Sequence, residues 1–315
     1  MGPIKIPRGV LGCLYLVFGL TIITGCKKEY DPPMVYVRVD AGKDTSIALR
    51  VDGTIWVWGE NKLGYLGDGT FKNQDRPVKI ASGFSDVAAG AEHFLALKYD
   101  GTLWAWGSNS HGQIGDGTNT ARLAPVQIGT GGYAAIATGS YESLALKNDG
   151  SLWVWGYNVD GTSSDQISPL QVGTGFKAMD GGFAFSIALK TDGTLWTWGS
   201  NLYGQLGDST MDNKATPNQI GSGYSSIRAG GFHSLAIKTD GTLWMWGTNV
   251  FGQLGDGTTG GKSVPFQLGS DFFTVAAGDN DSFALKTDGT LLAWGWGING
   301  ELGNGSSDED RKSVV

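Results

Sequence analysis

The sequence predicts an all-β fold built from one repeated unit, and three observations support this prediction. A tripeptide Asp-Gly-Thr or Asp-Gly-Ser recurs six times, at steps of 43 to 49 residues. Short stretches of alternating apolar residues flank each copy, which is the pattern of half-buried strands. A glycine-rich run follows the second stretch in most copies and interrupts any strand. The tripeptides begin at Asp52, Asp100, Asp149, Asp192, Asp240 and Asp288.

The second copy shows how each unit is organised. It has four short stretches, at 87–90, 94–97, 103–107 and 125–128. Asp-Gly between the second and third stretches suits the positive φ angles of a tight hairpin, so these two strands are expected to pair antiparallel. The proline that opens the fourth stretch fits an edge strand. Four short antiparallel strands every 45 to 50 residues or so are typical of a propeller blade. We therefore predict a β-propeller of six such repeats over residues 35–315.

The repeat also resembles a known family. Residues 88–118 contain Ala-Ala-Gly, Leu-Ala-Leu-Lys, Asp-Gly-Thr-Leu-Trp-Ala-Trp-Gly and Gly-Gln-Ile-Gly-Asp-Gly-Thr. These runs are similar to the repeat of the regulator of chromosome condensation family. The resemblance implies a β-propeller, usually of seven blades. Members of that family include a nuclear exchange factor for a small GTPase, a plant light receptor and secreted bacterial inhibitors of β-lactamases. The fold therefore does not fix the function.

The chain departs from this pattern in three places. The third repeat lacks the Gly-Gln-Leu-Gly-Asp segment. In the sixth repeat Leu292 replaces the first tryptophan and an additional Trp296 follows the glycine. Ser313 falls at the expected proline position of the last strand, and the sequence ends at Val315 before that strand is complete. Either six blades close directly on one another or a seventh repeat is missing, and the sequence leaves both alternatives open.

The first 26 residues predict export and lipid anchoring. Lys5 and Arg8 precede an apolar stretch at 10–23, which is too short for a membrane-spanning helix. It ends in Ile-Thr-Gly-Cys26, which resembles the lipobox of bacterial lipoproteins. We predict a signal peptide at 1–25 and a lipidated Cys26 with a tether at 26–34. The domain is then expected in the cell envelope, as an outer-membrane lipoprotein facing the periplasm or the cell surface, held to the membrane by the lipid alone.

Composition excludes several functions. The formal net charge is -7 and no basic run occurs, which disfavours nucleic acid as a partner. The domain has no cysteine nucleophile, no serine nucleophile elbow and no zinc-spaced Cys/His set, so we expect neither an enzyme nor a cofactor or metal. The Gly-Asp-Gly-Thr runs are interpreted as turns, because each offers too few carboxylates for calcium.

Five repeats carry two tryptophans at positions i and i+2 of the third strand, so both rings point to one side. A row of such rings could stack on sugars, but packing between blades is the favoured interpretation, because ten exposed rings would make an unusually large apolar patch. The pairs are Trp56/Trp58, Trp104/Trp106, Trp153/Trp155, Trp196/Trp198 and Trp244/Trp246.

The residues that differ between copies indicate where function could lie. Strands alternate in direction, so the loops after the first and third strands share one face of the disc, and only that face varies. Aromatic residues among polar neighbours are typical of protein-recognition surfaces. We predict a monomeric scaffold that binds a protein partner there; the alternative is a carbohydrate-binding envelope propeller. The predicted partner-binding residues are Tyr141, Tyr157, Phe183, Phe185, Tyr203, Phe232, His233, Phe251 and Trp296.

The central channel is the second candidate location. The first strand of each repeat is expected to be innermost, so its second position faces the channel. Asp40, Asp180 and Arg228 occupy that position in three repeats, where a structural ion pair is the favoured interpretation.

Overall fold

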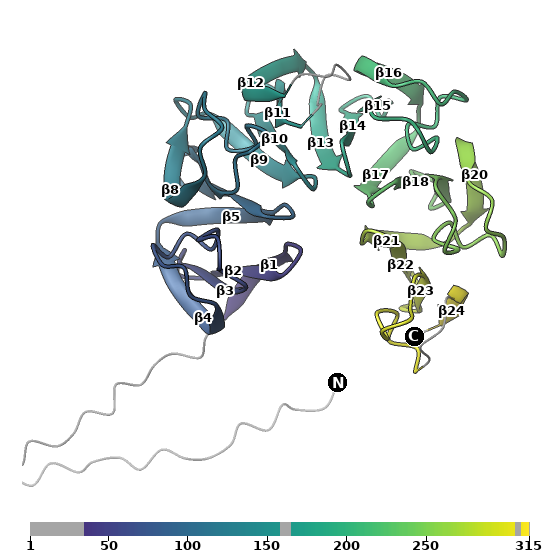
Figure 1. Ribbon diagram of the computed structural model, residues 1–315. Coiled ribbons are helices and arrows are strands. Elements are labelled where there is room, and N and C mark those ends of the chain that lie inside the picture. The colour runs from purple at the N-terminus through teal and green to yellow at the C-terminus, as the bar shows by residue number, and fades with distance from the viewer. Residues whose placement is uncertain (1–34, 158–164, 306–309, 315) are drawn as a thin grey trace, which may run out of the picture. The chain divides into compact units, whose positions relative to one another are not determined.

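The computed structural model describes residues 35–157, 165–305 and 310–314. These residues form six four-stranded antiparallel sheets, which confirms the predicted blades. The sheets follow one another along an arc, with the first strand of each on the inside (Figure 1). The predicted signal peptide, Cys26 and the tether lie outside the described residues. In the described part of the chain, no helix is long and apolar enough to cross a membrane.

The strands fall into four classes by their place in the blade. The inner strands are β1 (Tyr36–Ala41), β5 (Phe84–Ala89), β9 (Tyr133–Thr138), β13 (Phe176–Gly181), β17 (Tyr224–Ala229) and β21 (Phe272–Ala277). The second strands are β2 (Thr45–Arg50), β6 (His93–Lys98), β10 (Glu142–Lys147), β14 (Phe185–Lys190), β18 (His233–Lys238) and β22 (Asp281–Lys286). The third strands are β3 (Ile55–Gly59), β7 (Leu103–Gly107), β11 (Leu152–Gly156), β15 (Leu195–Gly199), β19 (Leu243–Gly247) and β23 (Leu291–Gly295). The outer strands are β4 (Gln74–Ala81), β8 (Arg122–Ile128), β12 (Gln166–Gly173), β16 (Lys214–Gly221), β20 (Lys262–Gly269) and β24 (Asp310–Val314).

The Asp-Gly-Thr tripeptide forms the turn between the second and third strands, as predicted. In the second blade, Asp100 Oδ1 accepts hydrogen bonds from the backbone N–H (2.9 Å) and hydroxyl (2.6 Å) of Thr102. The same hydroxyl accepts from Trp104 Nε1 at 3.1 Å, and Lys98 Nζ lies 3.8 Å from the Trp104 ring centroid. The turn, the first tryptophan and a lysine thus form one unit, which makes the hairpin face nearly uniform.

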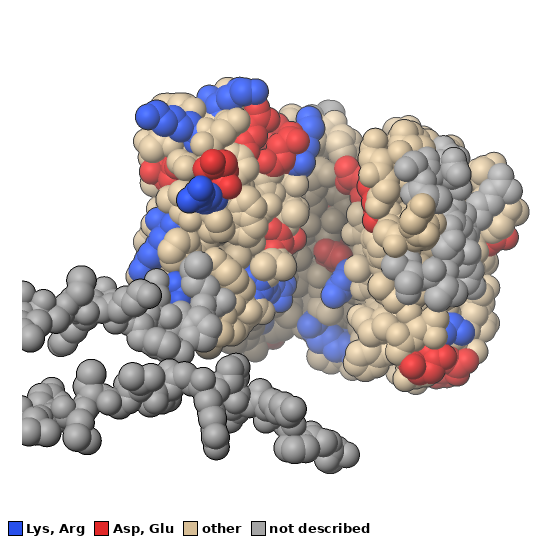
Figure 2. Space-filling view, turned by 90° about the horizontal axis from the view of Figure 1, so that it is seen from below, with Lys and Arg blue, Asp and Glu red and all other residues tan. Residues whose placement is uncertain are grey.

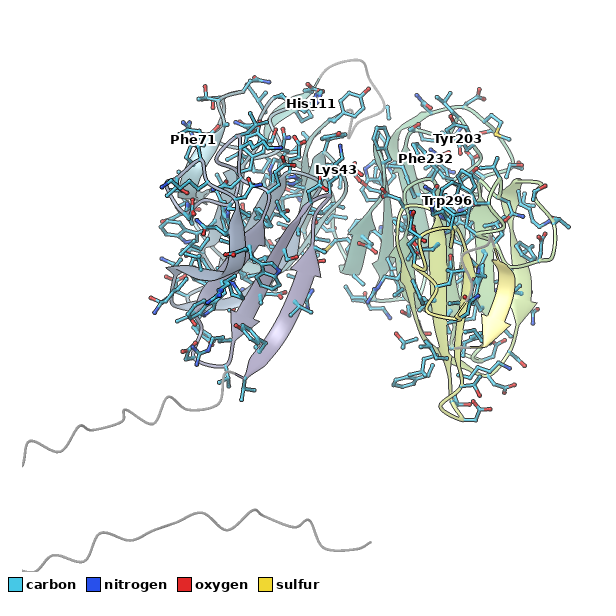
Figure 3. All side chains as sticks on the ribbon, turned by 60° about the horizontal axis from the view of Figure 1, so that its bottom comes forward. Lys43, Phe71, His111, Tyr203, Phe232 and Trp296 are labelled. Atoms are coloured by element: carbon cyan, nitrogen blue, oxygen red, sulfur yellow. The ribbon has the colours of Figure 1, made fainter. Side chains whose placement is uncertain are left out.

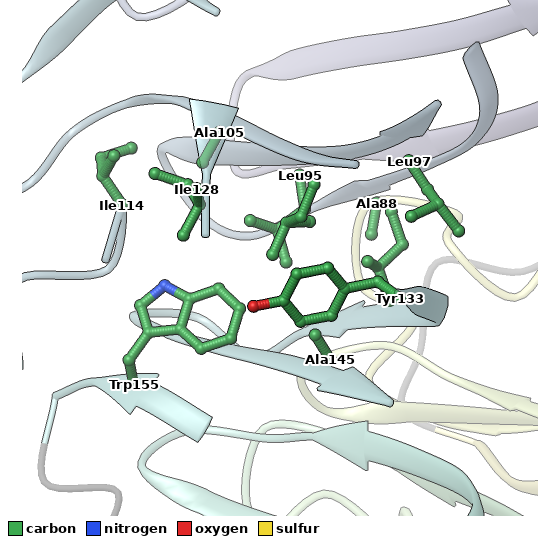
Figure 4. Packing of buried hydrophobic residues seen from close by; sticks show 11 residues of the cluster. Ala88, Leu95, Leu97, Ala105, Ile114, Ile128, Tyr133, Ala145 and Trp155 are labelled. Atoms are coloured by element: carbon green, nitrogen blue, oxygen red, sulfur yellow. The ribbon is translucent and has the colours of Figure 1, made fainter. Parts of the chain in front are cut away.

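In the second to fifth blades, the second tryptophan of the pair is fully buried and joins its blade to the preceding one. Between the second and third blades, Trp155 and Tyr133 pack against Leu95 and Ile114 (Figure 4). Trp155 is fully buried, and its Nε1 donates to the Gln113 carbonyl of the preceding blade at 2.8 Å. Burying one such ring contributes at most about 4–6 kcal/mol, from roughly 150–250 Å² at ~25 cal/mol/Å². The structure therefore confirms interblade packing as the role of these rings.

The sixth blade has a complete set of four strands, with one correction to the predicted register. Ser313 pairs with Ala293, whereas in the fifth blade the equivalent Met245 pairs with Phe266, the residue after the proline. Lys312, and not Ser313, therefore takes the position of the proline. The prediction was wrong by one residue because it counted the preceding loop as equal in length to that of the fifth blade.

The arc is open. Inner strands of successive blades contact one another from β1 and β5 through to β17 and β21, but no comparable contact joins β21 to β1. Figure 2 shows a deep hollow between the first and the sixth blade. We call this opening the slot. Of the two alternatives that the sequence left open, direct closure by six blades is therefore not observed.

Candidate functional site

The loops between inner and second strands are tied to one another through the backbone. Each of the first five loops donates a main-chain hydrogen bond to the loop of the next blade. From donor nitrogen to acceptor oxygen, the bonds are Lys43 to Ala91 (3.0 Å), Ala91 to Ser140 (3.0 Å), Ser140 to Gly182 (3.1 Å), Phe183 to Gly231 (2.8 Å) and Gly231 to Asp279 (3.1 Å). The variable loops thus have a common backbone frame, and their differences lie in the side chains.

The first residue of the second strand is fully buried beneath these loops in the second to fifth blades. In the second and fifth blades it is a histidine, and His93 Nε2 and His233 Nε2 lie 2.9 and 2.8 Å from the hydroxyls of Ser143 and Ser282 in the next blade. Burial lowers the pKa of both imidazoles to about 4, so they are neutral at physiological pH. Both histidines therefore have a structural role at the contact between neighbouring blades.

Two predicted partner-binding residues therefore need correction. His233 and Phe185 are fully buried at this same strand position, so a partner cannot contact them. The prediction placed them in the loop, because the second strands begin one residue earlier than their apolar alternation indicates. In the sequence, the signal for this burial was the serine at the second position of the second strand in the following blade, such as Ser143 or Ser282.

In four blades the loop after the third strand is held by the same turn, in which an asparagine side chain accepts a backbone hydrogen bond. In the second blade Asn109 Oδ1 accepts from the backbone N–H of Ile114 at 2.9 Å, and Asn109 Nδ2 donates to the Thr118 carbonyl at 2.8 Å. Asp116 accepts from the backbone and hydroxyl of Thr118 and from the guanidinium of Arg122. These carboxylates stabilise turns, as interpreted. No group of three or more His, Cys, Asp or Glu side chains lies in metal-binding proximity within the described residues.

The residue two positions after this asparagine differs between blades. In three blades its backbone N–H donates to the side-chain oxygen of the glutamine two residues later, at 2.9 Å in each case. The three residues held in this way are His111, Tyr203 and Phe251. The turn therefore presents different rings from the same place in different blades.

Six rings from the two loop sets form a continuous row across four blades. We call this set the aromatic row. The ring centroids are separated by 4.8 Å for Tyr157–His111, 5.4 Å for His111–Tyr141, 5.7 Å for Tyr141–Phe183, 5.0 Å for Phe183–Phe232 and 5.1 Å for Phe232–Tyr203. Tyr203 is half exposed, and the other five rings are partly exposed. Phe251 and Trp296 form a separate pair on the same face, with centroids 4.5 Å apart.

The structure thus brings together seven of the nine predicted partner-binding residues on one face. Figure 3 shows Tyr203, Phe232, Trp296 and His111 toward the same end of the blades. His111 was not among the predicted site residues, and it connects Tyr157 to Tyr141. Its Nδ1 is hydrogen bonded to the Asp165 carboxylate at 3.0 Å. Only the arrangement in space could show that this histidine bridges two blades.

A cavity of about 660 Å³ opens between the loops at the centre of the arc. Asp40, Asp180 and Arg228 line it, together with Tyr141 and Phe183 of the aromatic row. The channel position of these charges is therefore as predicted.

The prediction of an ion pair among these channel charges is wrong. Asp180 accepts from the backbone N–H of Ala229 in the next blade at 3.0 Å, and Arg228 donates to the Ile227 carbonyl at 2.8 Å. Asp40 likewise accepts from Ala89 at 3.0 Å. Burial raises the pKa of Asp180 to about 6. The two carboxylates thus join neighbouring blades through backbone amides instead of pairing with a cation.

Family models identify the repeat. The models described as Regulator of chromosome condensation (RCC1) repeat match this chain in two forms. One form matches residues 36–64, 84–113, 133–162, 176–205 and 224–253. The other matches residues 52–97, 100–146, 192–237 and 240–285, which together make up more than half of the chain. No curated protein matches the chain.

Solved structures agree on the fold. The chain resembles human WBSCR16 with a TM-score of 0.79 and 20% identity, covering 90% of this chain and 82% of that one. It resembles Prp20p from Saccharomyces cerevisiae with a TM-score of 0.78 and 24% identity, covering 89% and 76%. The yeast RCC1 (Prp20) bound to Kap60 gives a TM-score of 0.77 and 23% identity, covering 88% and 73%. At these identities the likeness establishes the architecture alone.

Proposed function

Because this chain belongs to the RCC1-repeat family of β-propellers, we propose that it is a binding scaffold that recognises a protein partner through the aromatic row. The Phe251–Trp296 pair on the same face extends the contact surface. The proposal assigns no catalytic step to the chain.

The observation that carries the proposal is the continuity of the row. Six partly exposed rings touch in sequence across four blades, on loops whose backbones are bonded to one another. Large rings on a rigid frame lose little conformational freedom on binding, and partly exposed aromatic anchors dominate the energetics of protein interfaces. The opposite face repeats one turn and offers no such variation.

Structural relatives are consistent with protein binding as a use of this fold. One of the similar yeast structures is a complex of RCC1 (Prp20) with Kap60, and the other is described with binding properties to Gsp1p and histones. Those partners belong to the yeast proteins. The acidic charge of the present chain, -7, makes histone-like or other basic partners electrostatically favourable and nucleic acid unfavourable.

The test is capture of a partner from cell-envelope extract by the full chain and by a variant combining Y141A, F183A and F232A. We expect one protein to be retained by the wild type and lost, by at least about tenfold, with the variant, because these three rings form the centre of the row. A control variant combines Y99A and F273A, which removes two rings that are 69% exposed but outside the row. This control should retain the partner.

Unchanged capture by the triple variant would refute the proposal. Glycan binding in an array, lost with the same triple variant and accompanied by no protein capture, would instead favour the carbohydrate-binding alternative. Both variants should show the thermal midpoint of the wild type within a few degrees, since none of the five rings is fully buried.

We further propose that the scaffold is held at the outer membrane by a lipid on Cys26. The apolar stretch and the lipobox-like Ile-Thr-Gly-Cys are the basis for this assignment. Metabolic labelling with palmitate should mark the wild type and should be lost in C26S, which should also leave the membrane fraction. Labelling that persists in C26S would contradict the proposal.

A further inference from the structure

A second pocket opens between the loops of the first and second blades, beside the central cavity. It has a volume of about 310 Å³. Residues 43–45, 60–63 and Tyr65 of the first blade line it, together with Ala91 and Glu92 of the second. Figure 3 shows Lys43 toward the same end of the blades as His111. We call this cavity the first-blade pocket. Ligand pockets span roughly 300–1,000 Å³, so its size suits one side chain better than a large ligand.

Equivalent places on the same face are filled by pairs of rings. In each pair, the residue two positions after the turn asparagine meets the middle residue of the next blade's first loop. The pairs are His111–Tyr141, with centroids 5.4 Å apart, and Tyr203–Phe232, with centroids 5.1 Å apart. In the first and second blades these positions hold Leu63 and Glu92, and both line the first-blade pocket. The pocket thus lies where an aliphatic and an acidic side chain replace two rings.

Part of the lining is apolar and accessible. Leu63 is 60% exposed, and Tyr65 and Ala91 are partly exposed. Tyr65 stands at the position where the second, fourth and fifth blades have a fully buried glutamine. These three side chains offer a surface on which an aliphatic chain can lie.

The remaining lining is charged, with an excess of carboxylates. Asp44, Glu60 and Glu92 stand against Lys43 and Lys62. Glu60 Oε1 pairs with Lys62 Nζ at 2.6 Å. Asp44 and Glu92 form no ion pair with any described residue. Lys43 also lines the central cavity, so it stands between the two. The pocket therefore favours a cation that brings its own apolar portion.

We propose that the first-blade pocket binds one arginine or lysine side chain of the protein partner. Long cationic side chains bury an aliphatic stem on apolar surface while the charged head stays among polar groups. Here the stem lies against Leu63 and Tyr65, and the head donates hydrogen bonds to the carboxylates of Glu92 and Asp44. The inference rests on the proposed function for the partner being a protein, and it adds the chemistry of one of that partner's residues.

The pocket is continuous with the aromatic row through the central cavity. Lys43 and Ala91 line both the pocket and that cavity, and Tyr141 and Phe183 of the row line the same cavity. One partner can therefore contact the rings and place a cationic side chain in the pocket. The two ends of this surface differ in chemistry, so they also fix the direction in which the partner lies.

The test measures protection of a thiol in the pocket by a cationic probe, N-acetyl-argininamide. A91C is made in a chain carrying C13S and C26S. S140C in the same background is the matched control, because Ser140 is the equivalent loop residue of the third blade and lines only the central cavity. At about 100 mM probe, labelling of A91C by N-ethylmaleimide should slow by at least about threefold, which corresponds to a dissociation constant of about 50 mM or below. N-acetyl-glutaminamide at equal ionic strength should leave the rate of A91C unchanged. Neither probe should slow S140C.

Two further variants of the A91C chain test the role of the charges. D44N combined with E92Q removes two carboxylates at nearly constant shape and should abolish the protection. K62Q frees Glu60 from its ion pair and should strengthen the protection.

The outcomes separate this site from the proposed function. No slowing of A91C, equal slowing by both probes, or slowing that survives D44N with E92Q would overturn the cation site, whatever the aromatic row binds. Protection of A91C as expected, together with unchanged partner capture by the Y141A, F183A and F232A variant, would uphold the cation site and refute the role of the row.

Discussion

At the scale of the residue, Glu142 is the buried group least suited to its place. It occupies the strand position that holds His93 and His233 in other blades. Its Oε1 lies 3.4 Å from the Ser186 hydroxyl, and its Oε2 has no hydrogen-bond partner among the described residues. Desolvation raises the pKa of this carboxyl well above its usual value. The charged form is therefore disfavoured in the folded chain.

The effect of replacing Glu142 by histidine on the free energy of unfolding should depend on pH. A carboxyl with a raised folded pKa contributes stability below its unfolded pKa, near 4.5, and loses it as the pH rises. A buried histidine, with its folded pKa lowered to about 4 as at His93, loses stability as the pH falls below 6.5. We expect E142H to stabilise the chain by about 1–3 kcal/mol at pH 8 and to be neutral or destabilising at pH 5. Urea unfolding at both pH values measures this.

One variant controls this prediction. H93A at the equivalent position should destabilise at pH 8, because it leaves a void and removes the partner of Ser143. A stability difference between E142H and wild type that does not change between pH 5 and pH 8 would contradict the account.

Burial at this position could not be predicted by reading alternation. In a sheet covered on one side, alternate residues face solvent, but the second to fifth blades here are covered on both sides by their neighbours. Consequently β6, β10, β14 and β18 are buried at five consecutive positions. The residue at this position does differ between copies, as at Phe185 and His233, but the side chains that differ are buried.

At the scale of the element, the glycine-rich loop places its backbone against a tryptophan of the next blade. Gly115 and Gly117 both have φ near +81°, so both need the left-handed conformation. A Cβ on Gly115 would lie 2.6 Å from Trp155 Nε1, whereas on Gly117 the nearest atom is the Ser168 hydroxyl at 3.7 Å. The first glycine therefore serves close packing as well as backbone conformation.

The pair G115A and G117A separates these two effects. G117A should cost about 1–2 kcal/mol, the strain of a left-handed alanine. G115A should cost a further 1–3 kcal/mol or so, because Trp155 must move. Chemical denaturation of the two variants measures the difference, and equal losses would show that the contact with Trp155 is unimportant.

The strands and turns were the most predictable part of the molecule. The Asp-Gly-Thr or Asp-Gly-Ser turn repeats six times, and the tryptophan pair and the proline repeat five times each. Each has a local physical meaning, so the hairpins and the four-stranded blades follow from the sequence. The aromatic row did not follow in full, because contacts such as His111–Tyr157 join residues of different blades. The Trp198 Nε1 has no partner among the described residues, which do not include residues 158–164 of the shortened third repeat.

At the scale of the whole molecule, the energy of a blade depends on its place in the arc. Leu243 and Leu291 occupy equivalent positions, but the first is fully buried and the second is 37% exposed. L243A should therefore cost about 2–5 kcal/mol, the usual loss for a buried leucine, and L291A less than half of that. Thermal or urea unfolding of both variants checks this expectation. Equal losses would mean that the sixth blade is covered in solution.

The number of blades around the axis could not be predicted from the sequence. Each repeat specifies how it pairs with the next one, but closure depends on the sum of all interblade rotations and on the last pair of faces. In the sequence those faces look the same as the five that are buried. Val39 and Leu291 are exposed, but they are apolar like the buried residues at the same strand positions of the other blades.

The backbone bonds that link the variable loops have a consequence for how this protein can change. The atoms that fix each loop, from Lys43 through Ala91, Ser140 and Gly182, are main-chain nitrogens and oxygens that nearly every residue type supplies. A mutation that exchanges a side chain on one loop therefore leaves the frame of its neighbours intact. Specificity can drift under selection, or be redesigned by grafting, one blade at a time and with little loss of foldability.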